Sequence, residues 1–436
     1  MISLAEVRLW GKLIGAVQWN AERRLGVFEY EPGFLRSGIQ LAPLQMPLRP
    51  GTFAFPELNY QSFHGLPGML ADALPDKFGN LLIDQWLVAN GRSPEDFNPV
   101  ERLLYMGQRG MGALEFAPAS RRAAPVSESL ELAELVSLAN RALAQKKNLA
   151  TAIHSGAEDQ HALQQIISVG TSAGGARAKA VVAWNPETGE VRSGQLDASE
   201  GFRHYLLKFD GVDGNSDKEL ADPQGFTRIE YAYYLMATAA GITMMPSHLL
   251  EENGRAHFMT ERFDREGGAG RLHMQTLCGL AHYDFNQAGG YSYEQCFRVI
   301  RQLEPDNVRA TLEQQYLRML FNLMSRNQDD HTKNIAFLMD KRGLWRLSPA
   351  YDVTFAWNPE GLWTSQHQMS VNGRRDHFTM SDLLAAAAAA DVREHRAYEL
   401  VAQVRGALER WSEYADAAGV PSDWAQRIEA GFRLFK

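Results

Sequence analysis

Cysteine is scarce in this chain of 436 residues, which contains only Cys278 and Cys296. Two cysteines build neither a disulfide framework nor a cysteine-rich metal cluster, and they suit a reducing cytoplasm. Long apolar runs are also missing. The longest one, a stretch of mostly alanine that begins at Leu383, is about half the length needed to span a bilayer. We interpret it as an alanine-rich helix that is capped by Ser381 or Asp382.

An excess of positive charge is absent as well. The 44 Lys and Arg residues face 52 Asp and Glu residues, which gives a formal net charge of -8. This balance argues against broad electrostatic capture of nucleic acid by this chain. Glu6, Arg8 and Lys12 interrupt any signal-like apolar core near the N-terminus, so we expect no membrane segment.

The composition that remains is ordinary for a globular protein, with 45% apolar and 22% charged residues. The order of the patterns predicts an α+β protein with three parts. Residues 1–125 form a small α/β unit and residues 126–268 a sheet-rich lobe. Residues 269–436 form a helical lobe. The segment 117–129 is the expected linker, and Asn253-Gly254 predicts a tight hairpin in the second part.

A glycine-rich stretch, GTSAGGARAK, spans residues 170–179. Glycine lets successive backbone N–H groups turn toward one point, which makes a nest for an anion. The stretch lacks the ending of a Walker loop, and a strand is expected after it. It therefore matches the arrangement by which protein kinases cover the phosphates of ATP. A hairpin turn without a ligand is the alternative.

Lys208 lies inside the apolar strand pattern RHYLLKFD. A lysine is costly to bury at such a position unless it is paired, and kinases place a strand lysine there to hold the nucleotide phosphates. Glu230, on the following helix, is a candidate partner for it. The alternative is an edge-strand lysine that reaches water, together with a surface glutamate.

The stretch RNQDDHTKN concentrates polar side chains directly before an apolar strand pattern. Asp329 and Asn334 are five residues apart, as in the D-x-x-x-x-N pattern of kinase catalytic loops. In that pattern the aspartate orients the acceptor hydroxyl and the asparagine reaches a metal ion on the phosphates. Asp352 follows in the next strand pattern and is expected beside Asn334, where two oxygen ligands suit Mg²⁺. A solvated polar turn is the alternative.

In this order, the stretches resemble the HipA family of serine/threonine kinases, the toxin halves of bacterial toxin–antitoxin pairs. The resemblance covers nearly the whole chain. FHGLPGMLADALPDKFGNLLIDQWL and LLYMGQRGMGALEF are similar to the HipA N-terminal domain, and SAGGARAKAVVAW, HYLLKFD, TERFDR, NQDDHTKNIAFL and WRLSPAYDV match other blocks of the family. A HipA-like fold, related to that of protein kinases, is therefore implied.

The resemblance also implies a role for individual residues. Asp329 corresponds to the catalytic aspartate, Asn334 and Asp352 to the Mg²⁺ ligands, and Ser172 to the autophosphorylated serine. A phosphate on Ser172 would occupy the anion nest and exclude the nucleotide. The residues implied to bind ATP are Gly174, Gly175, Ala176, Arg177, Ala178, Lys179, Lys208, Glu261, Arg262, Phe263, His331, Asn334, Tyr351 and Asp352.

The function implied is that of an ATP- and Mg²⁺-dependent kinase that phosphorylates an aminoacyl-tRNA synthetase and stalls translation. Its partner would be a small HipB-like helix-turn-helix antitoxin, which would supply the contact to DNA. Two alternatives stay open. A small-molecule phosphotransferase would show itself in a substrate screen, and a non-catalytic ATP-binding regulator of an antitoxin would bind ATP without turnover.

Overall fold

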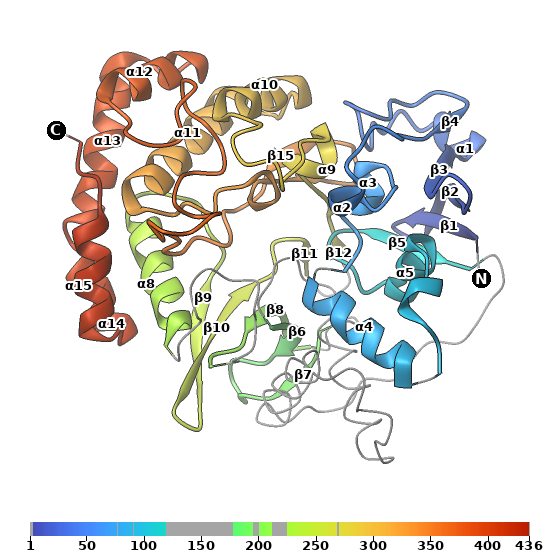
Figure 1. Ribbon diagram of the computed structural model, residues 1–436, viewed down its shortest axis with the longest axis horizontal. Helices are drawn as coiled ribbons and strands as arrows, with labels where there is room; N and C mark the ends of the chain where they lie inside the picture. Colours follow the sequence, from blue (N-terminus) through green and yellow to red (C-terminus); the bar gives the residue numbers. More distant parts are fainter. Residues whose placement is uncertain are drawn as a thin grey trace. The chain divides into compact units, whose positions relative to one another are not determined.

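The structure is a computed structural model, and it describes residues 3–75, 77–89, 91–118, 178–194, 200–211, 225–267 and 270–435. The chain divides into two compact units. The first comprises Met1–Ala42, Met46–Gln224 and Leu250–Met274, and the second comprises Pro43–Gln45, Gly225–Leu249 and Gln275–Lys436. Figure 1 shows helices together with several antiparallel sheets, so the predicted α+β class is confirmed. Most of the expected linker, from residue 119 on, lies outside the described residues.

The N-terminal sheet of the first unit has the strand order β4-β3-β2-β1-β5. Its strands are β1 (Leu4–Leu9), β2 (Lys12–Asn20), β3 (Leu25–Tyr30), β4 (Thr52–Phe53) and β5 (Leu114–Ala117). Trp10 and Gly11 join β1 to β2, and both have positive φ, at 50° and 76°. A two-residue turn of this kind matches the twist of the strands that it connects.

A second sheet has the order β7-β6-β8-β10-β9. Its strands are β6 (Lys179–Trp184), β7 (Val191–Ser193), β8 (Arg203–Lys208), β9 (Ser247–Glu252) and β10 (Arg255–Glu261). The predicted hairpin at Asn253-Gly254 is confirmed, since both residues have positive φ, at 47° and 77°. Only residues that tolerate the left-handed region fit such a turn.

Helix α4 (Lys77–Ala89) belongs to the core of this second sheet. Its buried Phe78 and Leu82 pack in one cluster with Val182, Leu207 and Met259. The predicted boundary near residue 125 therefore runs through one compact unit, because a helix before it and strands after it share a core. The division into three domains stays a prediction, and the compact units group these segments differently.

The remaining elements of the first unit are short. They are α1 (Pro32–Leu35), α2 (Tyr60–Phe63), α3 (Gly68–Ala71), η1 (Pro94–Asp96), α5 (Pro99–Met106), β11 (Arg265–Glu266) and β12 (Gly270–Arg271). Asn98 begins α5 with a capping box, in which Glu101 closes back onto the Asn98 backbone.

Helices dominate the second unit, in green to red in Figure 1. They are α8 (Phe226–Ala239), α9 (Leu277–Ala281), α10 (Tyr293–Leu303), α11 (Val308–Ser325), α12 (Met380–Ala389), α13 (Glu394–Leu408), α14 (Trp411–Ala418), α15 (Ser422–Gly431) and η3 (Thr332–Asn334). One sheet joins them, in the order β13 (His273–Thr276), β14 (Ala336–Met339) and β15 (Trp345–Leu347). Helix α11 is buried around much of its circumference, which marks it as a core helix.

The predicted cap of the alanine-rich helix was wrong. Thr379, and neither Ser381 nor Asp382, is the N-cap of α12. Asp382 instead closes the capping box from the third helical position, where it accepts from the Thr379 N–H at 2.8 Å. Among the described residues, no helix combines the length and the apolar character that crossing a membrane requires.

A buried carboxylate ties the two sheets of the first unit together. Asp264 is fully buried and accepts hydrogen bonds from Arg262 at 2.7 and 2.9 Å, from Arg265 at 2.8 Å and from the Gly112 N–H at 2.6 Å. Arg262 and Arg265 also donate to the Gly110 carbonyl. Burial alone would raise the pKa of Asp264, but the two guanidinium groups hold it well below its usual range.

Substituting Asp264 by Asn should lower the free energy of unfolding by roughly 3–5 kcal/mol, because it leaves buried guanidinium groups without their anion. The lowered pKa also means that this stabilisation is present above the ordinary carboxyl pKa of about 4 and is lost as the pH falls further. Urea unfolding at neutral pH and at about pH 3 checks both statements.

Arg342→Ala is the control. Its side chain is 75% exposed in a pair with Asp340, so its loss should cost less than about 1 kcal/mol. Equal effects of the two substitutions would contradict the structural role of Asp264.

Candidate active site

The polar stretch of residues 326–334, which we call the polar loop, connects helix α11 to strand β14. Arg326 ends the helix with a φ of 63°, in the left-handed region that stops helices. The loop then passes through η3 and enters a strand whose four residues are all buried. Because two core elements hold its ends, the polar loop is supported like a site on a rigid scaffold.

Asp329 is the most exposed acid of the loop, with 43% of its side chain accessible. The indole N–H of Trp363 donates to Oδ1 of Asp329 at 2.7 Å, and Nδ2 of Asn334 donates to the Asp329 carbonyl at 2.8 Å. Nε2 of His331 lies 3.8 Å from the same Oδ1. One carboxylate oxygen is therefore fixed by the protein, while the group stays accessible to an acceptor.

Asp330, unlike Asp329, is buried, with only 1% of its side chain exposed. Oδ2 accepts from the Tyr293 hydroxyl at 2.8 Å and contacts Nδ1 of His367 at 2.9 Å, and Oδ1 accepts from the Gln368 N–H at 2.7 Å. Burial by itself would raise the pKa of Asp330, but these donors stabilise the carboxylate and lower the pKa. The two adjacent aspartates therefore differ in their surroundings. Asp329 is accessible, whereas Asp330 is buried and its hydrogen bonds fix the loop in place.

An aromatic side chain lies beside the polar loop. The Phe285 ring is 5.6 Å from the ring of His331, and Nζ of Lys333 lies 4.5 Å above it in a cation–π contact. The Thr332 hydroxyl donates to the Tyr283 carbonyl at 2.7 Å. This bond holds the segment that contains Tyr283 and Phe285 against the polar loop.

Tyr351 and Asp352 follow strand β15, and the structure ties their segment to the polar loop. The Tyr351 hydroxyl donates to the Lys333 carbonyl at 2.6 Å. Buried Arg318 of α11 donates to the Ser348 carbonyl at 2.7 Å and fixes the turn before them. Asp352 itself has a φ of 53°, a conformation that aspartate tolerates better than most residues and that is often found at functional sites.

These residues fit a magnesium ion better than a metal that needs a closed protein cage. Among the described residues, no group of three or more His, Cys, Asp or Glu side chains is placed to hold a metal. Asn334 uses its amide nitrogen on the Asp329 carbonyl, so its amide oxygen remains as an acceptor. Mg²⁺ takes few protein oxygens and completes its shell with phosphate and water. Asn334 and Asp352 are the side chains that would hold it.

Two lysines face each other in the second sheet of the first unit. Lys179 of β6 and Lys208 of β8 are partners in the antiparallel register, and both are buried, at 2% and 5% exposed. Opposite residues of such a pair project from the same face of the sheet. Both side chains can therefore contact one anion such as a phosphate, and that contact stays a prediction.

The predicted adenine-side residues lie at the end of β10. Glu261 is paired at 3.4 Å with Arg203, and Phe263 is half-buried. The Arg262 guanidinium binds Asp264, and its backbone N–H donates to the His204 carbonyl at 2.9 Å. Their contact with a nucleotide stays a prediction.

Other predicted residues are placed as follows. Ala178 is buried directly before β6, and Glu230 is buried in α8 of the second unit, so its pairing with Lys208 stays a prediction. Ser172 and the loop residues Gly174, Gly175, Ala176 and Arg177 lie outside the described residues.

The structure also brings residues to the polar loop that the sequence did not indicate. Trp363 and His367 lie more than 30 residues along the chain from Asp329 and Asp330, and no local pattern marks them. Burial of the Lys179 side chain opposite Lys208 was missed in another way, because the sequence implied Lys179 only as the last residue of the glycine-rich stretch. Its signal was a lysine at the start of an apolar strand pattern, like that of Lys208.

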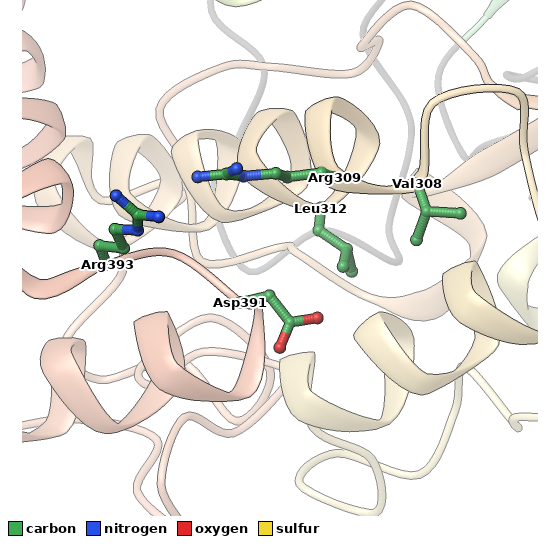
Figure 2. A pocket seen from close by; sticks show the side chains of 5 residues that line it. All are labelled: Val308, Arg309, Leu312, Asp391 and Arg393. Atoms are coloured by element: carbon green, nitrogen blue, oxygen red, sulfur yellow. The ribbon is translucent and has the colours of Figure 1, made fainter.

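A pocket of about 350 Å³ opens elsewhere in the second unit, lined by Val308, Arg309, Leu312, Asp391 and Arg393 (Figure 2). None of the predicted site residues contributes to it. Asp391 is already bound by Arg301 at 2.8 Å.

Comparison with known proteins identifies relatives of both parts of the chain. The family model of the HipA N-terminal domain matches residues 5–117, and the model of the HipA-like C-terminal domain matches residues 171–411. A curated relative, the putative kinase Y4mE of Sinorhizobium fredii, is 29% identical over 141 residues. That alignment covers 30% of this chain and 32% of the relative, so it spans about a third of either protein.

One solved structure has the same fold as this chain. HipA of the Shewanella oneidensis MR-1 toxin–antitoxin system, in a complex with HipB and operator DNA, is similar with a TM-score of 0.66. The likeness covers 98% of this chain and 96% of that chain at 17% identity, and it establishes a common fold. The Helicobacter pylori kinase CtkA is similar over 53% of this chain with a TM-score of 0.33, which does not establish one.

Proposed function

Since the chain belongs to the HipA family, we propose that it transfers the γ-phosphoryl group of ATP to a serine or threonine of a protein. The observation that carries the proposal is the geometry of Asp329. Its carboxylate is accessible, one of its oxygens is held by Trp363, and its backbone is held by Asn334. A group arranged in this way can orient an acceptor hydroxyl and receive its proton.

Other polar residues would bind the phosphates of the nucleotide and its metal ion. The buried pair Lys179 and Lys208 would bind phosphate oxygens, and Asn334 and Asp352 would hold Mg²⁺. Bound Mg²⁺ neutralises negative charge on the phosphates of the nucleotide. Phosphoryl transfer asks little covalent chemistry of the protein, so such positioning and charge neutralisation would supply most of the rate enhancement.

The biological setting is part of the same proposal. The chain would act as the toxin of a toxin–antitoxin pair in the cytoplasm, with an aminoacyl-tRNA synthetase as substrate and Ser172 as the site of self-phosphorylation. A HipB-like antitoxin is the proposed partner, because the solved relative was captured with HipB and operator DNA. The net charge of -8 agrees with a chain that would meet DNA through that partner.

Asp329→Ala should abolish phosphoryl transfer and leave the fold intact, because the side chain is half-exposed and contributes little to the core. The assay incubates the purified protein with ATP and Mg²⁺, alone and with cell extract, and maps phosphosites by mass spectrometry. Phosphate on Ser172 and on one extract protein, both absent in the variant, is the expected result. Ser172→Ala should keep transfer to that protein. Asp329-independent phosphate would contradict the assignment, and ATP binding without any transfer would favour a non-catalytic regulator.

Lys179→Met and Lys208→Met should each weaken ATP binding by about 10- to 100-fold, the size expected for a charge-assisted contact of roughly 1.5–3 kcal/mol. Calorimetric titration with a non-hydrolysable ATP analogue measures the change. Lys341→Met is the control, since Lys341 lies exposed in the turn after β14. If Lys179→Met binds like the control, its side chain does not contact the phosphates.

Trp363→Phe keeps an aromatic side chain but removes the indole N–H that donates a hydrogen bond to Asp329. It should therefore lower kcat by about tenfold or more while ATP affinity stays unchanged. In the Asp329→Ala background it should have no further effect, because the two residues act through one bond. Trp357→Phe is the control. Among the described residues the Trp357 indole N–H has no partner, and its ring packs under Arg326. A loss in both variants would point to packing instead.

A further inference from the structure

The segment that follows α15 is built into the support of the polar loop. The backbone N–H of Arg433 donates to the Met324 carbonyl at 2.9 Å, and its Nη1 donates to the Leu323 carbonyl at 3.0 Å. Its Nη2 contacts Gln328 of the loop at 3.3 Å and also binds Asp376. Only 12% of the Arg433 side chain is exposed.

Arg433 makes one more contact, and this contact has a chemical consequence. Its Nη1 lies 2.9 Å from Nε2 of His367, a residue that is fully buried. Arginine has only donors, so Nε2 must offer its lone pair and carry no hydrogen. The proton of a neutral imidazole is then on Nδ1, which lies 2.9 Å from Oδ2 of Asp330 and donates to it.

We propose that Arg433 locks His367 in the neutral Nδ1–H form, and that His367 thereby acts as a positioning residue for Asp329 through its neighbour Asp330. The chain of contacts is Arg433 to His367 to Asp330. Asn334 fixes the other side of the same peptide, at the Asp329 carbonyl. The peptide between the two aspartates is therefore held at its carbonyl and at the following side chain.

The charges around His367 agree with a neutral ring. Asp330 faces it from the polar loop and Arg433 from the segment after α15, while Asp376 and Arg326 lie one contact further on. The guanidinium of Arg375 donates to the His367 carbonyl at 2.6 Å and is a third cation at this site. Three cations already outnumber two anions, so a proton on His367 would add an uncompensated buried charge. The backbone N–H of His367 donates to the Arg375 carbonyl, and the Phe378 ring packs against the imidazole.

Arg433 itself remains a cation at neutral pH, although burial lowers its pKa to about 10. Arg433 therefore stays a donor to Nε2 of His367 at neutral pH. Free imidazole exchanges its proton between both nitrogens. The locked ring keeps its donor on Asp330.

The first test is spectroscopic and does not depend on the proposed function. Nitrogen NMR of the full chain with labelled histidine reports the tautomer and titration of each of the 12 histidines, and His367→Asn assigns the signal. The expected signal at neutral pH is that of a neutral ring with its proton on Nδ1. A wild-type His367 that is charged at neutral pH, or carries its proton on Nε2, would falsify the proposal.

Variants of Arg433 give the second test. Arg433→Met removes the donor, so His367 should then populate both tautomers, whereas Arg433→Lys keeps a donor and should keep the lock. Arg427→Met is the matched control, because Arg427 is an exposed arginine of α15. A mixture of both tautomers in the lysine variant as well would overturn the role of the donor.

Kinetics then test the positioning role, which rests on the proposed kinase activity. His367→Leu should lower kcat by about tenfold or more with KM for ATP unchanged, while His367→Asn, which retains an N–H for Asp330, should restore most of kcat. Equal loss in both variants would overturn the positioning role. If the spectra show the lock but wild-type protein transfers no phosphate, the proposed function fails and the tautomer assignment stands.

Discussion

The buried carboxylate of Asp330 is the interaction on which the candidate site depends. An ionised group inside a protein persists only when donors replace the water that it has lost. Here the hydroxyl of Tyr293 comes from helix α10, and an imidazole and a backbone N–H come from the adjacent residues His367 and Gln368 of a second segment. Removing any of these donors would leave the charge under-solvated, so the carboxylate selects one arrangement of the polar loop.

A second buried carboxylate, that of Asp264, is also surrounded by donors, and it lies in the first unit. Asp264 draws Arg262 and Arg265 to the loop around Gly110 and Gly112, which ties the N-terminal sheet to the segment after β10. Both sites surround a carboxylate with donors, at least one of which comes from a distant segment of the chain. One site supports the architecture of a unit, and the other supports the residue that would carry the chemistry.

The contacts around the polar loop fix the orientation of the accessible Asp329 carboxylate. Effective proton acceptance needs a carboxylate held in one orientation, because freedom of the group would have to be lost again in the transition state. Trp363, Asn334 and the anchored Asp330 remove most of that freedom beforehand. The paired lysines of β6 and β8 project from one face of their sheet, which is the arrangement that the proposed phosphate contacts require.

The sequence by itself determined the α+β class, the hairpin at Asn253-Gly254 and the family, because these follow from local periodicity, turn chemistry and short motifs. It also indicated Asp329, Asn334 and Asp352 as a group, since their spacing lies within one loop and one hairpin. Only the tertiary structure decided that Asp330 is an anchor while Asp329 is accessible, because burial depends on what packs against a residue. It alone brought Trp363, His367 and Arg433 to the loop, since contacts over 34 to 105 residues of chain leave no local pattern.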